Sequence, residues 1–242
     1  MHRSMPLKAI LFDKDGTLVD FHATWSAATY AIFHRLASGD EDKVARLAQA
    51  SDYDLTTRLI GANSPLIAAS SADYGVVWAE ILGEAPDERF FARMDEVAMQ
   101  EANARLVALG EPAAILGLLR AEGYVLGIVT NDSEAGARAH CDILGLTSLL
   151  DVIFGYDSGH GRKPEPGPVL AFAARNGLEP QEVALVGDSL HDLHAARAAG
   201  AVAIAVLSGL AGAEDLGADA DHVVADIAAL PGLLRSLAEP AP

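Results

Sequence analysis

The pattern of apolar and polar positions divides the chain into three stretches. A short apolar run at residues 9–12 predicts a strand buried on both faces, because polar residues and Gly16 end the run within four positions. Between residues 21 and 106, apolar residues recur every three or four positions, which predicts helices only. From residue 107 on, apolar runs alternate with helical patterns, as in a parallel sheet with right-handed crossovers. The sequence therefore predicts an α/β fold, a three-layer Rossmann-like parallel-sheet core with an inserted all-helical block.

The individual elements follow from the same pattern, with Gly, Pro and capping residues marking their ends. The expected helices span residues 21–37, 42–50, 64–82, 87–106, 112–122, 134–144, 168–176 and 190–199. After the first strand, the expected strands span residues 124–130, 152–154, 182–186, 201–207 and 222–224. Thr24 is a candidate N-cap of the first helix, and residues 155–168 are expected to form a loop.

Two carboxylates follow the first strand directly. Asp13 and Asp15 are expected at its carboxyl end, where the crevice of a parallel sheet binds ligands, and Gly16 allows a sharp turn there. Acids this close repel each other unless a positive group lies between them. Taken alone, Asp-x-Asp-Gly fits a turn with capping acids about as well as it fits a binding site.

The charge balance narrows the possible partners. The 242 residues include 17 Lys and Arg against 34 Asp and Glu, a net charge of −17, which argues against nucleic acid because a phosphate backbone needs a basic face. An anionic substrate would need a local cation, which favours a bound metal together with a Lys or Arg.

Cys141 is the only cysteine, so no intrachain disulfide is possible. With neither a signal-peptide pattern nor a membrane-spanning run, we expect a cytoplasmic protein without a membrane partner.

The residues around the first acids are more specific than the acids alone. Phe-Asp-Lys-Asp-Gly-Thr-Leu at residues 12–18 resembles the first motif of the haloacid dehalogenase superfamily, whose phosphatase members use the first Asp as nucleophile. Lys14 stands where an apolar residue is more usual. We expect Lys14 to place a charge beside the site and to leave the chemistry untouched.

Three further motifs of that family follow in the expected order. Thr130 and Asn131 end the second strand and match the position that binds the transferred phosphoryl oxygens, although Asn131 with Glu134 also fits a helix capping box. Lys163, directly before a proline, matches the family's lysine, which pairs with the nucleophile and the phosphoryl group. On its own, a lysine in such a loop is usually just solvated.

The last motif is Gly-Asp-Ser at residues 187–189, with a second acid four residues after the first. By resemblance Asp188 is a magnesium ligand, and Asp192 orients Lys163 or a metal-bound water. Read from the residues alone, either acid also fits a helix N-cap or a favourable charge in a first turn.

The resemblance implies a Mg²⁺-dependent phosphatase that acts on a small phosphorylated metabolite through an aspartyl-phosphate. The helical cap at residues 21–106, set between core segments 1–20 and 107–242, most resembles the phosphoglycolate-phosphatase-like and β-phosphoglucomutase-like branch. Asp13 would attack phosphorus, and Asp15 would act as general acid and base. Asp13, the Asp15 backbone carbonyl and Asp188 would hold Mg²⁺, with Thr17 in a supporting role.

Other functions remain open on the same motifs. A phosphomutase is the nearest alternative. A dehalogenase is disfavoured by Asp15, which those relatives lack, and an idle binding module is disfavoured because none of the motif residues is missing. The cap candidates for substrate specificity are His22, Trp25 and Arg58, although Trp25 also fits cap core and Arg58 a solvated helix charge. The chain is expected to be a monomer or a homodimer.

Overall fold

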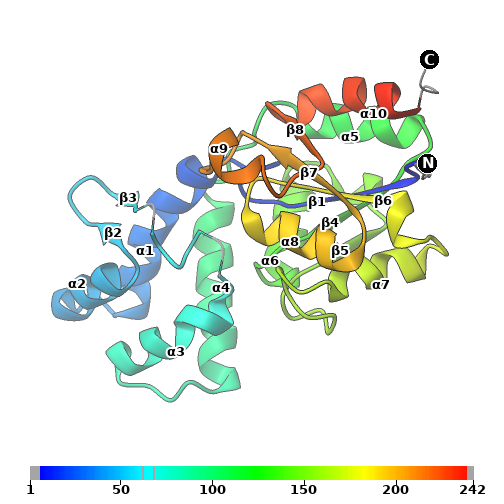
Figure 1. Ribbon diagram of the computed structural model, residues 1–242. Helices are drawn as coiled ribbons and strands as arrows, with labels where there is room; N and C mark the ends of the chain where they lie inside the picture. Colours follow the sequence, from blue (N-terminus) through cyan, green and yellow to red (C-terminus); the bar gives the residue numbers. More distant parts are fainter. Residues whose placement is uncertain (1–5, 62, 68, 239–242) are drawn as a thin grey trace.

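The structure, a computed structural model, describes residues 6–238 except 62 and 68, and its centre is a parallel sheet (Figure 1). Its strand order is β5-β4-β1-β6-β7-β8, with every neighbouring pair parallel. The strands are β1 (Ala9–Phe12), β4 (Val125–Val129), β5 (Val152–Phe154), β6 (Val183–Gly187), β7 (Val202–Val206) and β8 (His222–Val224). Since β4 and β6 flank β1, residues that follow these three strands lie close together.

Alternate residues of β1 point to opposite faces of the sheet, and both faces are covered. Ala9 and Leu11 belong to one buried hydrophobic cluster, and Ile10 and Phe12 belong to another. The first cluster packs against α7 (Gly167–Arg175) and α8 (Leu190–Ala199). The second packs against α5 (Pro112–Ala121), α6 (Glu134–Ile143) and α10 (Leu230–Ala238). This arrangement confirms the predicted three-layer α/β core.

Residues 21–103, here called the helical unit, lie to one side of the sheet and have their own hydrophobic core, which includes Phe33, Trp78 and Met94 (Figure 1). Its helices are α1 (Ala27–Leu36), α2 (Glu41–Ala50), α3 (Ser71–Leu82) and α4 (Glu88–Asn103). The unit also holds a short antiparallel pair, β2 (Tyr53–Asp54) and β3 (Leu59–Ile60), which the helical periodicity did not predict. Strands of two residues are too short to produce a detectable alternation.

The two connections between the helical unit and the sheet run side by side. The backbone N–H of Asp20 donates to the Val107 carbonyl over 2.8 Å, and that of Leu109 donates to the Leu18 carbonyl over 2.9 Å. The chain therefore leaves and re-enters the core at one place. The predicted domain limits, 1–20 and 107–242 against 21–106, remain a prediction, and their residues 1–5 and 239–242 lie outside the described part.

Several element ends differ from the prediction for local reasons. Thr24 is not an N-cap: it lies in a π-helical turn, His22–Ser26, and its hydroxyl accepts a hydrogen bond from the Val107 N–H. Ser133, not Asn131, caps α6, accepting a hydrogen bond from the Gly136 N–H over 3.2 Å. The predicted helix at 64–82 begins only at Ser71, after a capping box formed by Ser70 with Asp73.

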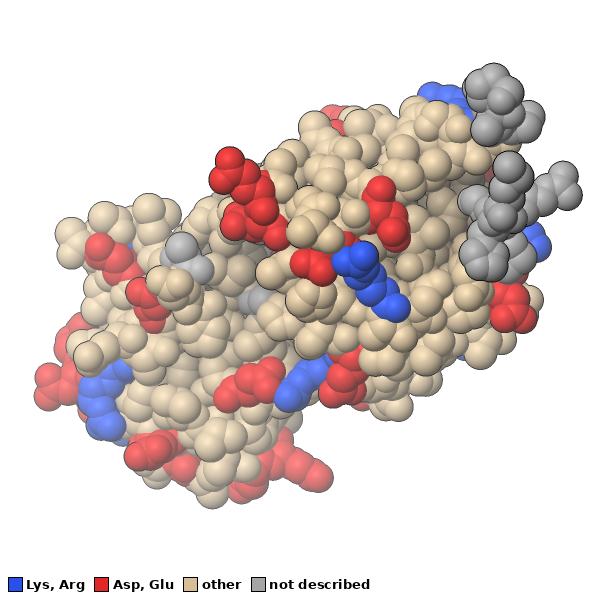
Figure 2. All heavy atoms as spheres, viewed as in Figure 1, with Lys and Arg blue, Asp and Glu red and all other residues tan. Residues whose placement is uncertain are grey.

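The surface reflects the acidic composition. On the face drawn in Figure 2, acidic side chains are spread over both parts of the molecule and no continuous basic patch is visible. Among the described residues, none of the helices combines the length and apolar character that crossing a membrane requires.

Candidate active site

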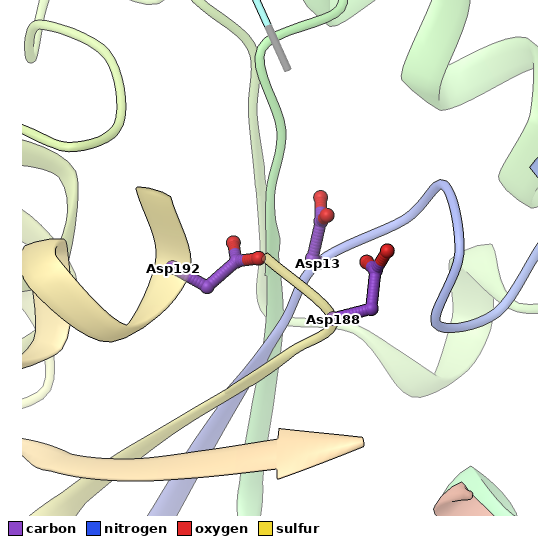
Figure 3. Close-up of side chains that lie close together, drawn as sticks. All are labelled: Asp13, Asp188 and Asp192. Atoms are coloured by element: carbon purple, nitrogen blue, oxygen red, sulfur yellow. The ribbon is translucent and has the colours of Figure 1, made fainter. Parts of the chain in front are cut away.

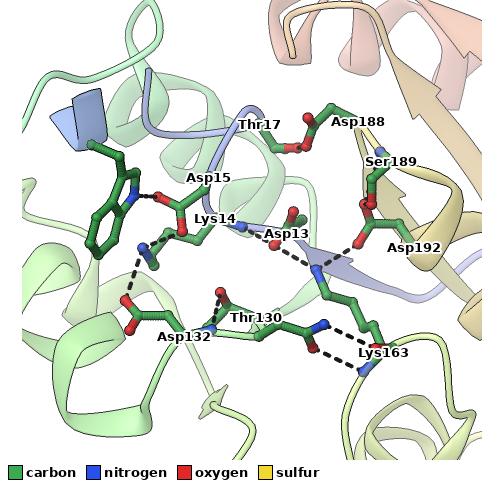
Figure 4. Close-up of polar contacts among 12 residues, drawn as sticks. Asp13, Lys14, Asp15, Thr17, Thr130, Asp132, Lys163, Asp188, Ser189 and Asp192 are labelled. Carbon is green, nitrogen blue, oxygen red and sulfur yellow. Dashed lines mark hydrogen bonds and ion pairs between the residues drawn. The ribbon is translucent and has the colours of Figure 1, made fainter. Parts of the chain in front are cut away.

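The predicted site residues converge at the carboxyl edge of the sheet. Asp13 follows β1, Thr130 follows β4 and Asp188 follows β6, while Lys163 reaches the same place from the loop before α7 (Figure 4). The strand order explains this arrangement, because three neighbouring parallel strands end together. The four motifs predicted from the sequence therefore line one cavity.

Three buried carboxylates lie together at this edge, and a single ammonium group pairs with two of them. Oxygens of Asp13, Asp188 and Asp192 lie within 4.8 Å of one another, and each of the three residues is at most 8% exposed (Figure 3). The Nζ of Lys163 lies 2.6 Å from an oxygen of Asp13 and 2.6 Å from an oxygen of Asp192. Asp188 has no such cation among the described residues; its Oδ1 accepts a hydrogen bond from the Thr17 hydroxyl over 3.3 Å.

Burial and the repulsion between neighbouring carboxylates raise the pKa values of Asp13 and Asp188. Burial and the charge of Asp192 raise the pKa of Asp13 to about 7, against the lowering effect of Lys163. Burial, Asp13 and Asp192 raise the pKa of Asp188 well above its ordinary value. The cluster thus lacks positive charge, and its donors are all carboxylate oxygens, the ligands that Mg²⁺ prefers. The residues present fit a hard divalent cation.

Asp192 is already saturated by protein donors. Besides Lys163, it accepts hydrogen bonds from the Ser189 N–H over 3.0 Å and from the Ser189 hydroxyl over 2.6 Å. Its carboxylate therefore caps α8 and holds the lysine. The remaining carboxylates, Asp13 and Asp188, are those open to a cation.

Two glycines leave the space in which the Asp188 carboxylate lies. A Cβ at Gly16, where φ is +82°, or at Gly209 would overlap the Asp188 side chain. The hydroxyl of Ser208 donates to the Gly16 carbonyl over 2.8 Å, which ties the loop after β7 to this turn. Sequence reasoning did not single out Gly209, because its close approach to Asp188 is visible only in three dimensions.

Thr130 and Asn131 differ in what they offer to a ligand. Thr130 is buried in the cavity wall, and its hydroxyl accepts a hydrogen bond from the Asp132 N–H over 3.1 Å. The Asn131 side chain holds the backbone of Lys163: its Nδ2 donates to the Lys163 carbonyl over 2.9 Å, and its Oδ1 accepts from the Lys163 N–H over 3.0 Å. Asn131 therefore positions the lysine loop.

Lys14 lies in a second charge cluster that the sequence did not predict. It is 1% exposed, and its Nζ contacts Asp15 at 2.6 Å and Asp132 at 3.2 Å (Figure 4). The same Nζ lies 3.0 Å from the His140 Nδ1. The other oxygen of Asp15 accepts a hydrogen bond from the Trp25 Nε1 over 2.6 Å. Lys14 is thus in direct contact with Asp15, a predicted catalytic residue, and the expectation that Lys14 leaves the chemistry untouched stays a prediction.

The protonation states in this cluster follow from burial. Burial alone would lower the pKa of Lys14, but the carboxylates of Asp15 and Asp132 outweigh it and raise the pKa to about 12. Burial and Lys14 lower the pKa of His140 to about 3. The imidazole is therefore neutral at pH 7 and accepts the hydrogen bond from Lys14 at Nδ1.

The three predicted cap residues do not share one location. Trp25 lines the cavity and contacts Asp15. Arg58 is exposed, has a φ of +59° and stacks over the Tyr30 ring at 4.1 Å. The Nδ1 of His22 lies 3.1 Å from the Ser26 hydroxyl. Of the three, only Trp25 belongs to the described cavity lining.

The chain is similar to known hydrolases over most of its length. A family model for haloacid dehalogenase-like hydrolases matches residues 7–200. A phosphoglycolate phosphatase of Rhodospirillum rubrum is 35% identical over 214 residues, covering 83% of this chain and 79% of that protein. One of Chromobacterium violaceum is 34% identical over 215 residues, covering 88% and 90%. The solved HAD phosphatase of Thermococcus onnurineus shares the fold, with a TM-score of 0.66 at 24% identity over 94% and 98% of the two chains.

Replacing Lys14 tests the second cluster through stability. Lys14→Met keeps most of the length of the side chain but leaves two partly buried carboxylates without their cation, so we expect the free energy of unfolding to fall by about 3–5 kcal/mol. Urea denaturation followed by circular dichroism measures the loss. Lys8→Met, which removes the half-exposed partner of Glu182, is the matched control and should cost much less. Equal losses in the two variants would contradict a structural role for the buried lysine.

Proposed function

The chain belongs to the haloacid dehalogenase-like hydrolases, and from that membership we propose that it cleaves a small phosphate monoester through an aspartyl-phosphate formed on Asp13, with Mg²⁺ as cofactor. It is a phosphoric monoester hydrolase. The observation that carries the proposed mechanism is the ion pair of Asp13 with Lys163, at the floor of a cavity that also exposes Asp15 and Asp188.

In the first step, a carboxylate oxygen of Asp13 attacks phosphorus and the ester P–O bond breaks. The ammonium of Lys163 lies beside Asp13, so it stabilises negative charge on the phosphoryl oxygens while it orients the nucleophile. Asp192 and Asn131 hold that lysine through its Nζ and its backbone. Asp15 gives its proton to the departing alkoxide.

In the second step, Asp15 takes a proton from water, and the resulting hydroxide attacks phosphorus. Phosphate leaves and the Asp13 carboxylate is restored. The hydroxyl of Thr130 faces the cavity and donates to a phosphoryl oxygen. Asp13 and Asp188, with the backbone carbonyl of Asp15, would hold Mg²⁺, which would supply positive charge to the phosphoryl oxygens.

The free protein favours the base form of Asp15. Burial would raise its pKa, but Lys14, His140 and the hydrogen bond from Trp25 lower it below the ordinary value. That state suits the second step. For the first step, Asp15 must carry a proton, so the contacts of Lys14 and Trp25 with Asp15 are expected to change when the substrate binds.

We propose that the helical unit acts as a cap over the site. Its contacts with the rest of the molecule include Trp25 with Asp15, Arg162 with Asp73 at 2.6 Å, and the Tyr156 hydroxyl with Asp95 at 2.7 Å. A cap that touches the acid residue can exclude water from the site during the first step.

Asp13→Asn tests the nucleophile. We expect this variant to fold and to show no phosphate release from 2-phosphoglycolate or other esters, because an amide oxygen is a poor nucleophile. Wild-type protein with Mg²⁺ should yield a protein-bound phosphate that hydroxylamine removes, and the variant should yield none; quenched reactions with labelled ester measure this. Asp42→Asn, on the surface of α2, is the control. A labelled acyl-phosphate on Asp13→Asn would place the nucleophile elsewhere.

Asp15→Asn separates the acid role from a structural one. An alkoxide needs a proton as it leaves and a nitrophenolate does not, so we expect hydrolysis of an alkyl phosphate to fall by about 10²–10⁴-fold. The first step with 4-nitrophenyl phosphate should fall much less, and phosphoenzyme should accumulate because the water has lost its base. Stopped-flow release of nitrophenolate measures the first step. The same loss on both esters would show that Asp15 acts only as a positioning residue.

A further inference from the structure

The cavity continues from the acidic cluster into the helical unit. Its acidic end contains Asp13, Asp15, Asp188 and Lys163. The part beyond, here called the chamber, is formed by residues of the helical unit: Phe21, Trp25, Thr29, Ile32, Ile60, Leu66, Ile67, Ala69, Tyr74, Trp78, Met94, Asp95 and Ala98.

The chamber is apolar and aromatic. Both tryptophans of the chain line it, and the N–H of each ring is already used, by Asp15 for Trp25 and by the Ser51 hydroxyl for Trp78. The rings therefore offer apolar surface to an occupant. Tyr74 stacks on Trp78 with ring centres 4.8 Å apart, which extends that surface.

Positive charge is confined to the acidic end. Among the described lining residues, Lys163 is the only Lys or Arg, and it already pairs with Asp13 and Asp192. Arg162, the next residue in the chain, pairs with Asp73 and the Ser70 hydroxyl on α3. Arg58 stacks on Tyr30.

The other polar groups of the lining do not supply an anion site. Asp95 is the one charged residue of the described chamber, and it accepts a hydrogen bond from the Tyr156 hydroxyl. Its carboxylate repels a second anion. His191 belongs to the acidic end, three residues after Asp188, and burial lowers its pKa, so it carries no fixed positive charge at pH 7.

From this arrangement we propose that the substrate is the phosphate ester of an uncharged, apolar alcohol, aromatic or branched aliphatic, whose organic part fills the chamber. The proposal rests on the phosphatase function above and specifies its substrate class. A carboxylate on the alcohol would lose its water in the chamber without gaining a cation, and it would face Asp95. An apolar group would instead contact Trp25, Trp78 and Met94.

Two matched esters test the proposal. Benzyl phosphate and 4-carboxybenzyl phosphate have the same reacting group and differ by a carboxylate at the far end of the ring. We expect kcat/KM for benzyl phosphate to exceed that for the carboxylated ester, and that for 2-phosphoglycolate, on the order of 10²-fold. Equal values, or a preference for either carboxylated ester, would overturn the proposal.

A pair of variants then tests the cause. Ile67→Arg places a cation in the chamber, so it should raise kcat/KM for 4-carboxybenzyl phosphate at least about tenfold relative to benzyl phosphate. Val76→Arg places the same cation on the half-exposed outer face of α3 and should leave the ratio unchanged. An equal change in both variants would show that overall charge, and not the chamber, sets the preference.

A binding measurement separates this proposal from the catalytic one. Since both tryptophans line the cavity, benzylphosphonate should change the protein's fluorescence at concentrations at which 4-carboxybenzylphosphonate does not, and Trp78→Phe should reduce the change. Absence of phosphate release from every ester with Mg²⁺ would overturn the phosphatase mechanism, whereas the fluorescence preference would still support the apolar chamber. Phosphate release with equal or reversed phosphonate binding would overturn the chamber proposal alone.

Discussion

The site depends on a shortage of positive charge at one edge of the sheet. Asp13, Asp188 and Asp192 are buried within 4.8 Å of one another, and Lys163 pairs with two of them. Buried carboxylates that outnumber their cations are costly, so the arrangement is stable only when further positive charge or protons compensate. We propose that a divalent cation supplies that charge. Together with Lys163, this cation would allow a dianionic phosphoryl group to approach a protein of net charge −17.

A second charge cluster, around Lys14, connects the proposed acid Asp15 to the helical unit. Lys14 pairs with both Asp15 and Asp132, and Trp25 donates to Asp15 from the helical unit. The same tryptophan forms part of the apolar chamber wall. One residue therefore contacts both the proposed acid and the space proposed for the alcohol, so a substrate that fills the chamber also lies against the group that protonates its oxygen.

The sequence predicted the parts of the site that are local in the chain. Asp13, Thr130 and Asp188 follow short apolar strands, and a parallel sheet brings such positions together whatever the helices do. Contacts across long separations were predictable only where the family resemblance implied them, as for Lys163 with Asp13. Nothing local ties Lys14 to His140, 126 positions away.

The same limit applies to the helical unit, where the specificity roles of Arg58 and His22 stay predictions. Arg58 and His22 were chosen by residue type, whereas the cavity wall is set by how α1, α3 and α4 pack. The β2-β3 pair is too short to produce a detectable alternation in the sequence. Ser133 caps α6 because the Asn131 side chain is hydrogen-bonded to the backbone of Lys163 instead.

Calorimetric titration of Mg²⁺ at pH 7 tests the charge shortage most directly. The account predicts a single site in the wild-type protein and its loss in Asp188→Asn, which removes the carboxylate that lacks a protein cation. Gly209→Ala retains all the charges but crowds that carboxylate, so it should weaken binding, while Gly212→Ala, whose Cβ meets no close contact, should not. Binding of Mg²⁺ to Asp188→Asn with wild-type affinity would contradict the account.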